Sequence, residues 1–151
     1  MPTHAEKRIL PYRPEQMYDL VAGVEHYPAF LPWCIGARIR ERNDNLLVAD
    51  LIIGFKMFRE RFTSRVTLDP AKQRIDVAYS EGPFKYLKNH WIFRPHAQGC
   101  EIDFFVDFEF RNRLLQKTIE LLFGEAVRRM VAAFETRAEA LYGKQGQVTS
   151  G

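Results

Sequence analysis

The sequence of 151 residues contains little cysteine, no long apolar run and little excess charge. Its two cysteines, Cys34 and Cys100, lack the spacing of a metal site or a redox motif, which favours a reduced, intracellular protein. No stretch of about 18 apolar residues occurs, and the N-terminus lacks the apolar core of a signal peptide. The net charge of +3 does not by itself predict binding to nucleic acid. We therefore expect a cytoplasmic protein that binds no DNA, spans no membrane and is at most peripheral to the inner membrane.

Motifs of catalysis are also scarce. The sequence has no glycine-rich phosphate loop, no Gly-x-Ser-x-Gly elbow and no His-Glu-x-x-His pair, and its histidines are scattered, so we predict no metal site. His90 is the one histidine inside a strong strand pattern, and we expect it to be solvated or bonded within a sheet rather than catalytic. Cys34 has no cationic neighbour in sequence and is expected to be a small buried apolar group. The sequence thus predicts no catalytic residue and no cofactor, and leaves a cyclase-like enzyme as an alternative.

Aromatic residues are abundant, with 12 Phe, 6 Tyr and 2 Trp. Such a load indicates either a dense core or an apolar cavity. Residues 114–141 predict one long amphipathic helix, with Asn112 as N-cap and Gly143 as the stop. The apolar side of this helix is nearly twice as wide as the roughly 100° that packing on one surface requires, so the rest of the chain should wrap around it or leave a cavity beside it. Gly124, opposite Leu115, suggests an outer bend at which the first turns act as a gate.

The residues before this helix change from helical to strand periodicity. Residues 3–10 predict an edge strand, residues 14–22 a short helix, and residues 24–34 one compact helical turn. Short turns then separate six alternating segments, which makes them antiparallel neighbours. These six strands are predicted at residues 36–42, 46–55, 59–68, 74–80, 85–94 and 100–110.

The order of elements predicts an α+β fold. A seven-stranded curved antiparallel sheet should wrap around the long C-terminal helix, with two short helices between the first two strands. We expect residues 1–143 to form a single monomeric domain and residues 144–151 to form a disordered polar tail.

Three stretches carry a resemblance to a known family. They are Tyr27-Pro-Ala-Phe-Leu-Pro-Trp-Cys34, the pair Gly54-Phe55 leading into residues 59–66, and Val106-Asp-Phe-Glu-Phe110. Together they resemble the coenzyme Q-binding START-domain proteins, which are grouped with polyketide cyclase/dehydrase-like proteins and with a bacterial toxin said to block ribosomal subunit association. The resemblance spans residues 6–142.

The resemblance implies a helix-grip (START/Bet v-like) fold with an apolar tunnel between sheet and helix. It implies that this tunnel holds ubiquinone or a similar polyprenyl lipid, and that the protein is a carrier or chaperone for respiratory electron transport and quinone biosynthesis, without turnover. The motif that closes one side of the tunnel is matched by Phe30, Leu31, Trp33 and Cys34.

The predicted ligand-binding residues are apolar and aromatic side chains of the strands, of the compact turn at residues 24–34 and of the long helix, together with one arginine. They are Tyr27, Phe30, Leu31, Trp33, Phe62, Trp91, Phe104, Phe108, Leu115, Ile119, Leu122, Phe123, Met130, Phe134 and Arg137. Both Arg137 and Glu120 fall within the apolar arc of the helix. Such residues usually reach the rim or pair with an acid, and the alternative is that Arg137 meets the oxygens of a quinone ring.

Two surface contacts are also predicted. Phe55, Met57 and Phe58 lie beside cations and suit an apolar tip that dips into an anionic membrane, the alternative being that they join the core.

A basic stripe could contact ribosomal phosphates, although a solvated outer face of the sheet is the simpler interpretation. Because the resemblance includes the toxin group, it implies as the alternative function a toxin-like factor that binds the large ribosomal subunit and blocks subunit association. The stripe consists of Arg38, Arg40, Arg42, Arg59, Arg61 and Arg65.

Overall fold

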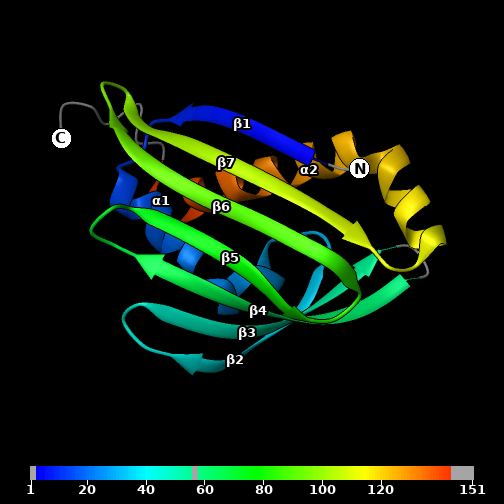
Figure 1. Ribbon diagram of the computed structural model, residues 1–151. Coiled ribbons are helices and arrows are strands. Elements are labelled where there is room, and N and C mark those ends of the chain that lie inside the picture. Colours follow the sequence, from blue (N-terminus) through cyan, green and yellow to red (C-terminus); the bar gives the residue numbers. More distant parts are fainter. Residues whose placement is uncertain (1–2, 56–57, 144–151) are drawn as a thin grey trace.

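The computed structural model describes residues 3–55 and 58–143, apart from the side chain of Phe55. Within these residues, seven strands form one antiparallel sheet in the order β1-β7-β6-β5-β4-β3-β2. Figure 1 shows this curved sheet with β1 at one edge and β2 at the other. The strands are β1 (Thr3–Leu10), β2 (Cys34–Arg42), β3 (Leu46–Phe55), β4 (Phe58–Asp69), β5 (Arg74–Glu81), β6 (Phe84–His96) and β7 (Gly99–Phe110).

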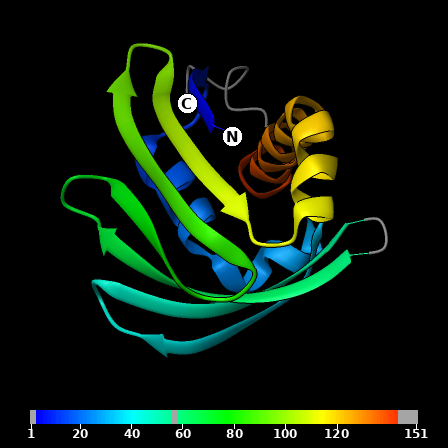
Figure 2. The same cartoon turned by 45° about the vertical axis from the view of Figure 1, so that its right-hand side comes forward.

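Two short helices and one long helix accompany the sheet in the described residues. The α-helix α1 (Pro14–Ala22) and the 3-10 helix η1 (Val24–Ala29) connect β1 to β2, and α2 (Arg113–Tyr142) ends the described chain. Figure 2 shows the sheet curling around the side on which the helices lie. The predicted α+β, helix-grip architecture is confirmed. The predicted tail, residues 144–151, lies outside the described residues.

The sequence pattern places most element boundaries within one residue of those in the structure. Elements β1, α1 and β3 begin and end at the predicted residues. The largest shift at a strand start is in β2, which begins at Cys34 instead of Gly36 because Cys34 already pairs with Ile53 across a bulge. The sheet can continue through this irregularity because a bulge inserts a residue without ending the ladder.

Glycine is required where β6 turns into β7. Gly99 has a φ of 137°, in the region that residues with a side chain rarely adopt, and a Cβ there would lie 2.3 Å from the Leu10 carbonyl oxygen. The turn therefore brings β7 directly beside the end of β1. This close approach allows the first strand of the chain to pair with the last one.

Helix α2 starts from a fixed point at the end of β7. The Asn112 side chain accepts a hydrogen bond from the Leu115 backbone N–H at 3.0 Å, which confirms it as the N-cap. The buried Gln116 accepts another from the Phe110 backbone N–H at 2.8 Å and donates to Glu120 at 2.9 Å. Glu120, which the helical pattern placed in the apolar arc, is therefore exposed and paired with an amide on its own helix.

Helix α2 is continuous but not straight. In both ribbon views its first turns, coloured yellow, run in a different direction from the orange remainder. Gly124 is exposed, and a Cβ there would approach only the Arg128 Nη1 atom, at 3.6 Å, so packing does not require glycine at this position. The predicted bend is present, and the gating role of the first turns stays a prediction.

The apolar core has two parts. The larger part gathers α1, η1 and the C-terminal half of α2 against the sheet, with Met17 and Phe93 each 1% exposed. The smaller part contains Phe62, Phe84, Phe110 and Leu115, near the start of α2. Between Gln116 and Val127 no residue of α2 is fully buried. The middle of α2 therefore covers a space that side chains do not fill.

Candidate ligand-binding cavity

A cavity of about 330 Å³ lies between the sheet, the segment that joins η1 to β2, and α2. Its volume falls within the roughly 300–1,000 Å³ typical of pockets for small ligands. Most of the predicted ligand-binding residues line it. They are Tyr27, Leu31, Trp33, Phe62, Trp91, Phe104, Phe108, Leu115, Ile119, Phe123, Met130 and Phe134.

Three predicted ligand-binding residues do not line the cavity. Phe30 packs behind the wall, with its ring 5.3 Å from that of Phe134. Arg137 places its Cζ atom 5.3 Å above the ring of Phe30, and its buried Nε atom has no hydrogen-bond partner in the described residues. The buried face of α2 is centred closer to Phe123 than the apolar pattern of the sequence indicated. Leu122 therefore lies to one side of this face and is only half-buried. Arg137 therefore lies beside Phe30 and outside the cavity lining, and its contact with a ligand stays a prediction.

Phe134 packs against two other aromatic residues of the cavity wall. Its ring lies 5.7 Å from Tyr27 and 5.3 Å from Trp91, in edge-on arrangements that are favourable for aromatic pairs. The Tyr27 hydroxyl donates a hydrogen bond to the Val21 carbonyl oxygen, and burial raises the pKa of this phenol well above its usual value. Tyr27 therefore remains a neutral part of the wall at physiological pH.

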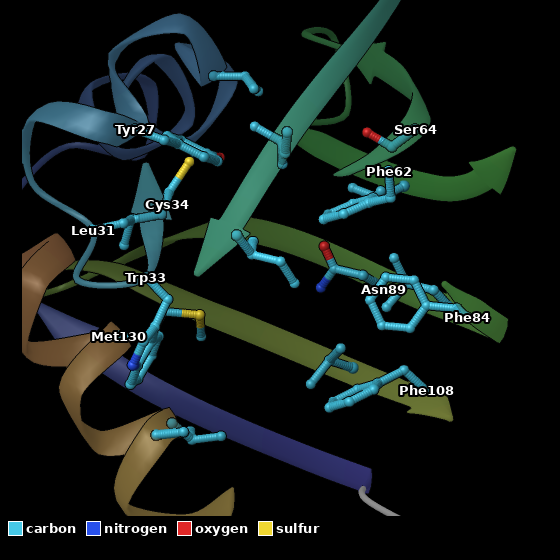
Figure 3. A pocket seen from close by; sticks show the side chains of 18 of the residues that line it. Tyr27, Leu31, Trp33, Cys34, Phe62, Ser64, Phe84, Asn89, Phe108 and Met130 are labelled. Atoms are coloured by element: carbon cyan, nitrogen blue, oxygen red, sulfur yellow. The ribbon is translucent and has the colours of Figure 1, made fainter. Parts of the chain in front are cut away.

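Few polar side chains interrupt the apolar lining. Ser64 on β4 is 2% exposed, and Asn89 on β6 is half-buried. The Asn89 Nδ2 group donates to the Phe105 carbonyl oxygen at 2.8 Å, and the Trp91 Nε1–H donates to Asn89 Oδ1 at 3.1 Å. Figure 3 shows Asn89 near Phe62, Phe84 and Phe108, with Trp33 and Met130 across the cavity. The cavity thus combines aromatic walls with one oriented amide.

The sequence-based reasoning missed Asn89, although a signal existed. Leu87, Asn89, Trp91 and Phe93 alternate along β6, and the structure points this set to the inside of the sheet. A polar residue in an otherwise apolar inward series is the kind of exception that marks a binding group. Glu60 and Ser64, both on β4, are two further polar lining residues that the pattern did not single out.

Acid–base groups do not converge on the cavity. His90 is stacked on Phe105, with ring centroids 5.4 Å apart, and does not line the cavity. Cys34 does line it, but burial raises the pKa of its thiol, which disfavours the reactive thiolate. In the described ranges, no three His, Cys, Asp or Glu side chains gather as a metal site would require. The arrangement suits binding of an apolar molecule better than proton transfer.

Phe58 does not form an apolar tip. It is half-buried, lines the cavity and packs with the cluster around Phe62, so it joins the core as the alternative interpretation stated. Met57 and the side chain of Phe55 lie outside what the structure describes. No helix in the described part of the chain is both long and apolar enough to cross a bilayer.

A curved antiparallel sheet closed over a long C-terminal helix, with an apolar cavity between them, is the helix-grip fold. The family model described as polyketide cyclase/dehydrase and lipid transport matches residues 10–135, and the chain belongs to this family.

Individual relatives have different names. The chain is 41% identical over 135 residues to the ribosome association toxin RatA of Rickettsia prowazekii, covering 87% of this chain and 92% of that protein. It is 35% identical over 146 residues to the mitochondrial coenzyme Q-binding protein COQ10 homolog B of Xenopus laevis, covering 94% of this chain and 60% of that protein. The solution structure of the 18 kDa protein CC1736 from Caulobacter crescentus has a TM-score of 0.77 and 35% identity, covering 95% of this chain and 99% of that one.

Proposed function

We propose that the protein binds ubiquinone or a similar polyprenyl lipid in its cavity and acts as a carrier or chaperone, in the cytoplasm and at the surface of the inner membrane. The observation that carries this proposal is the cavity of about 330 Å³ with aromatic walls. The relative named as a coenzyme Q-binding protein supports the choice of ligand. Burial of apolar surface contributes about 25 cal/mol per Å², so an isoprenoid tail would supply much of the affinity.

The cavity volume limits how much of the ligand is enclosed. A volume of about 330 Å³ lies near the lower end of the roughly 300–1,000 Å³ of pockets that enclose drug-sized ligands. A substituted quinone ring with the first isoprene units fits within this limit. The rest of a long tail would have to lie outside the cavity or widen it.

Affinity for ubiquinones of increasing tail length tests the proposal. We expect affinity to rise at least tenfold with each of the first isoprene units, because each one buries several apolar carbons, and then to reach a plateau when the cavity is full. Titration calorimetry with a series of short-chain ubiquinones measures this dependence. Absence of binding for every member, together with absence of lipid in a solvent extract of protein purified from a quinone-producing bacterium, would contradict the proposal.

We infer that the bound lipid is not turned over. A cyclase or dehydratase needs a positioned acid or base inside the cavity. Among the described lining residues, the titratable ones are Tyr27, Cys34 and Glu60, and burial raises the pKa of the first two. The family name includes cyclases, so the cyclase alternative is checked by recovering the ligand chemically unchanged after incubation.

A second candidate function, binding to the ribosome, is favoured by the outer face of β2 and β4. Two arginines of the predicted stripe are engaged by acids: Arg40 by Asp50 at 2.7 Å and Arg42 by Glu25 at 2.6 Å. The remaining four are exposed and form no ion pair within residues 3–55 and 58–143. They are Arg38, Arg59, Arg61 and Arg65. Several relatives are named ribosome association toxins, which supports this candidate for the same chain.

Salt dependence of ribosome binding separates this candidate from nonspecific attraction. If Arg38, Arg61 and Arg65 contact phosphates, replacing all three by glutamine should reduce the slope of log affinity against log salt by about 3. Cosedimentation with large ribosomal subunits over a salt series measures this slope.

A matched variant removes three other exposed cations, Lys88, Lys117 and Arg128, by the same replacement. It lowers the net charge equally but leaves the outer face of β2 and β4 intact. Equal loss in the two variants would assign the binding to net charge and remove this candidate.

A further inference from the structure

Asn89 occupies a position in the cavity wall where its strand neighbours are valines. In the register of the sheet, Val66 pairs with Val77, Val77 pairs with Asn89, and Asn89 pairs with Val106. All four residues line the cavity. A valine at this position would continue the apolar row, so the amide is an exception that the sheet itself does not require.

Two hydrogen bonds fix the orientation of this amide. The indole N–H of Trp91 can only donate, so the atom facing it at 3.1 Å is Asn89 Oδ1. Asn89 Nδ2 then faces the Phe105 carbonyl oxygen at 2.8 Å. The side chain is therefore held before any ligand arrives, which reduces the entropy that binding would otherwise cost.

The amide retains hydrogen-bonding capacity after these two contacts. An asparagine amide has two N–H donors and two acceptor lone pairs, and each protein contact uses one. One N–H and one lone pair remain on a side chain that lines an apolar cavity. The N–H suits a carbonyl oxygen, and the lone pair suits a hydroxyl group, so one amide can bind both the oxidised and the reduced form of a quinone ring.

We propose that Asn89 anchors the polar ring of the ligand through its free Nδ2–H, and that Trp91 is a positioning residue that holds the amide in place. This inference rests on the proposed function, since it assigns the quinone ring to the part of the cavity around Asn89. The tail then lies along the aromatic and aliphatic side chains that form the rest of the lining. Arg137, which stacks on Phe30 outside the lining, takes no part in binding.

The test compares a ligand that has carbonyl groups with one that has none. Decylubiquinone carries the ring, and the isoprenoid hydrocarbon farnesene carries no oxygen. Replacing Asn89 by leucine should lower the affinity for decylubiquinone about five- to twentyfold, because one hydrogen bond is lost. It should leave the affinity for farnesene unchanged or slightly higher. Trp91→Phe also alters the cavity wall, so it should weaken the binding of both ligands, and that of decylubiquinone more than that of farnesene. Arg137→Ala should change the binding of neither ligand. Titration calorimetry measures all four proteins, and thermal unfolding verifies that each is folded.

Infrared spectroscopy measures the carbonyl frequency of the bound quinone. A purely structural role of Asn89 would not change this frequency, whereas a hydrogen bond from Asn89 would. With decylubiquinone labelled with carbon-13 at its carbonyls, one carbonyl band should shift to lower frequency in the wild-type complex and return toward its free position in Asn89→Leu. Equal affinity of wild type and Asn89→Leu for decylubiquinone, equal loss for both ligands, or an unshifted band would each overturn the anchor while leaving the proposed function in place. If wild type binds farnesene or nothing, and never decylubiquinone, the proposed function fails as well.

Discussion

Replacing Ala126 by phenylalanine is expected to remove ligand binding without unfolding the protein. Ala126 lines the cavity from the middle of α2, where no neighbouring residue between Gln116 and Val127 is fully buried. A phenyl ring at this position would occupy space that the ligand needs. Displacing or compressing a ligand in a filled site costs about 2 kcal/mol or more, so affinity should fall at least about thirtyfold.

The control for this variant is Ala132→Phe, which adds the same side chain to an exposed position on the same helix. It should bind short-chain ubiquinone like wild type. Thermal unfolding without ligand should show an unchanged or higher midpoint for Ala126→Phe, because the ring fills an apolar void. If both variants bind like wild type, the ligand does not occupy this cavity.

The fold could be predicted from the sequence because its signals are local. Each strand from residue 34 to residue 110 is separated from the next by a short turn, and its alternation identifies the face that is buried. Asn112 and Gly143 mark the ends of α2 by chemistry that depends on only a few neighbouring residues. The sequence predicted β1 as an edge strand but did not identify β7 as its partner, since no short turn connects these two strands.

The details of the candidate site could be predicted less completely because they depend on distant contacts. A register shift between Phe84 and Tyr86 changes the alternation of β6, and Asn89 then faces inward with Leu87 and Trp91. The rotation of α2 about its axis decides that Phe123 faces the cavity whereas Leu122 does not. Whether a cavity exists at all depends on how closely a helix and a sheet from different parts of the chain approach, and no local pattern encodes that separation.

Two phenylalanines should show that stability and binding depend on different parts of the molecule. Phe93 is 1% exposed, packs against Tyr18 and Trp91, and does not line the cavity. Its replacement by alanine leaves a void among tightly packed neighbours and should cost about 3–5 kcal/mol of unfolding free energy. For a chain of this size the unfolding midpoint should fall by roughly 6–20 °C.

Phe123 is half-buried and faces the cavity from α2, so its ring already lacks packing partners on one side. Phe123→Ala should cost only about 1–2 kcal/mol, since less apolar surface returns to water. It should nevertheless lower the affinity for short-chain ubiquinone more than Phe93→Ala does. The affinities are measured at a temperature below the unfolding midpoints of both variants. The cavity is empty space bounded by side chains that contribute less to folding than the packed end of the sheet. Equal destabilisation by the two variants would mean that α2 is held as firmly over the cavity as over the core, and would argue against its first turns acting as a gate.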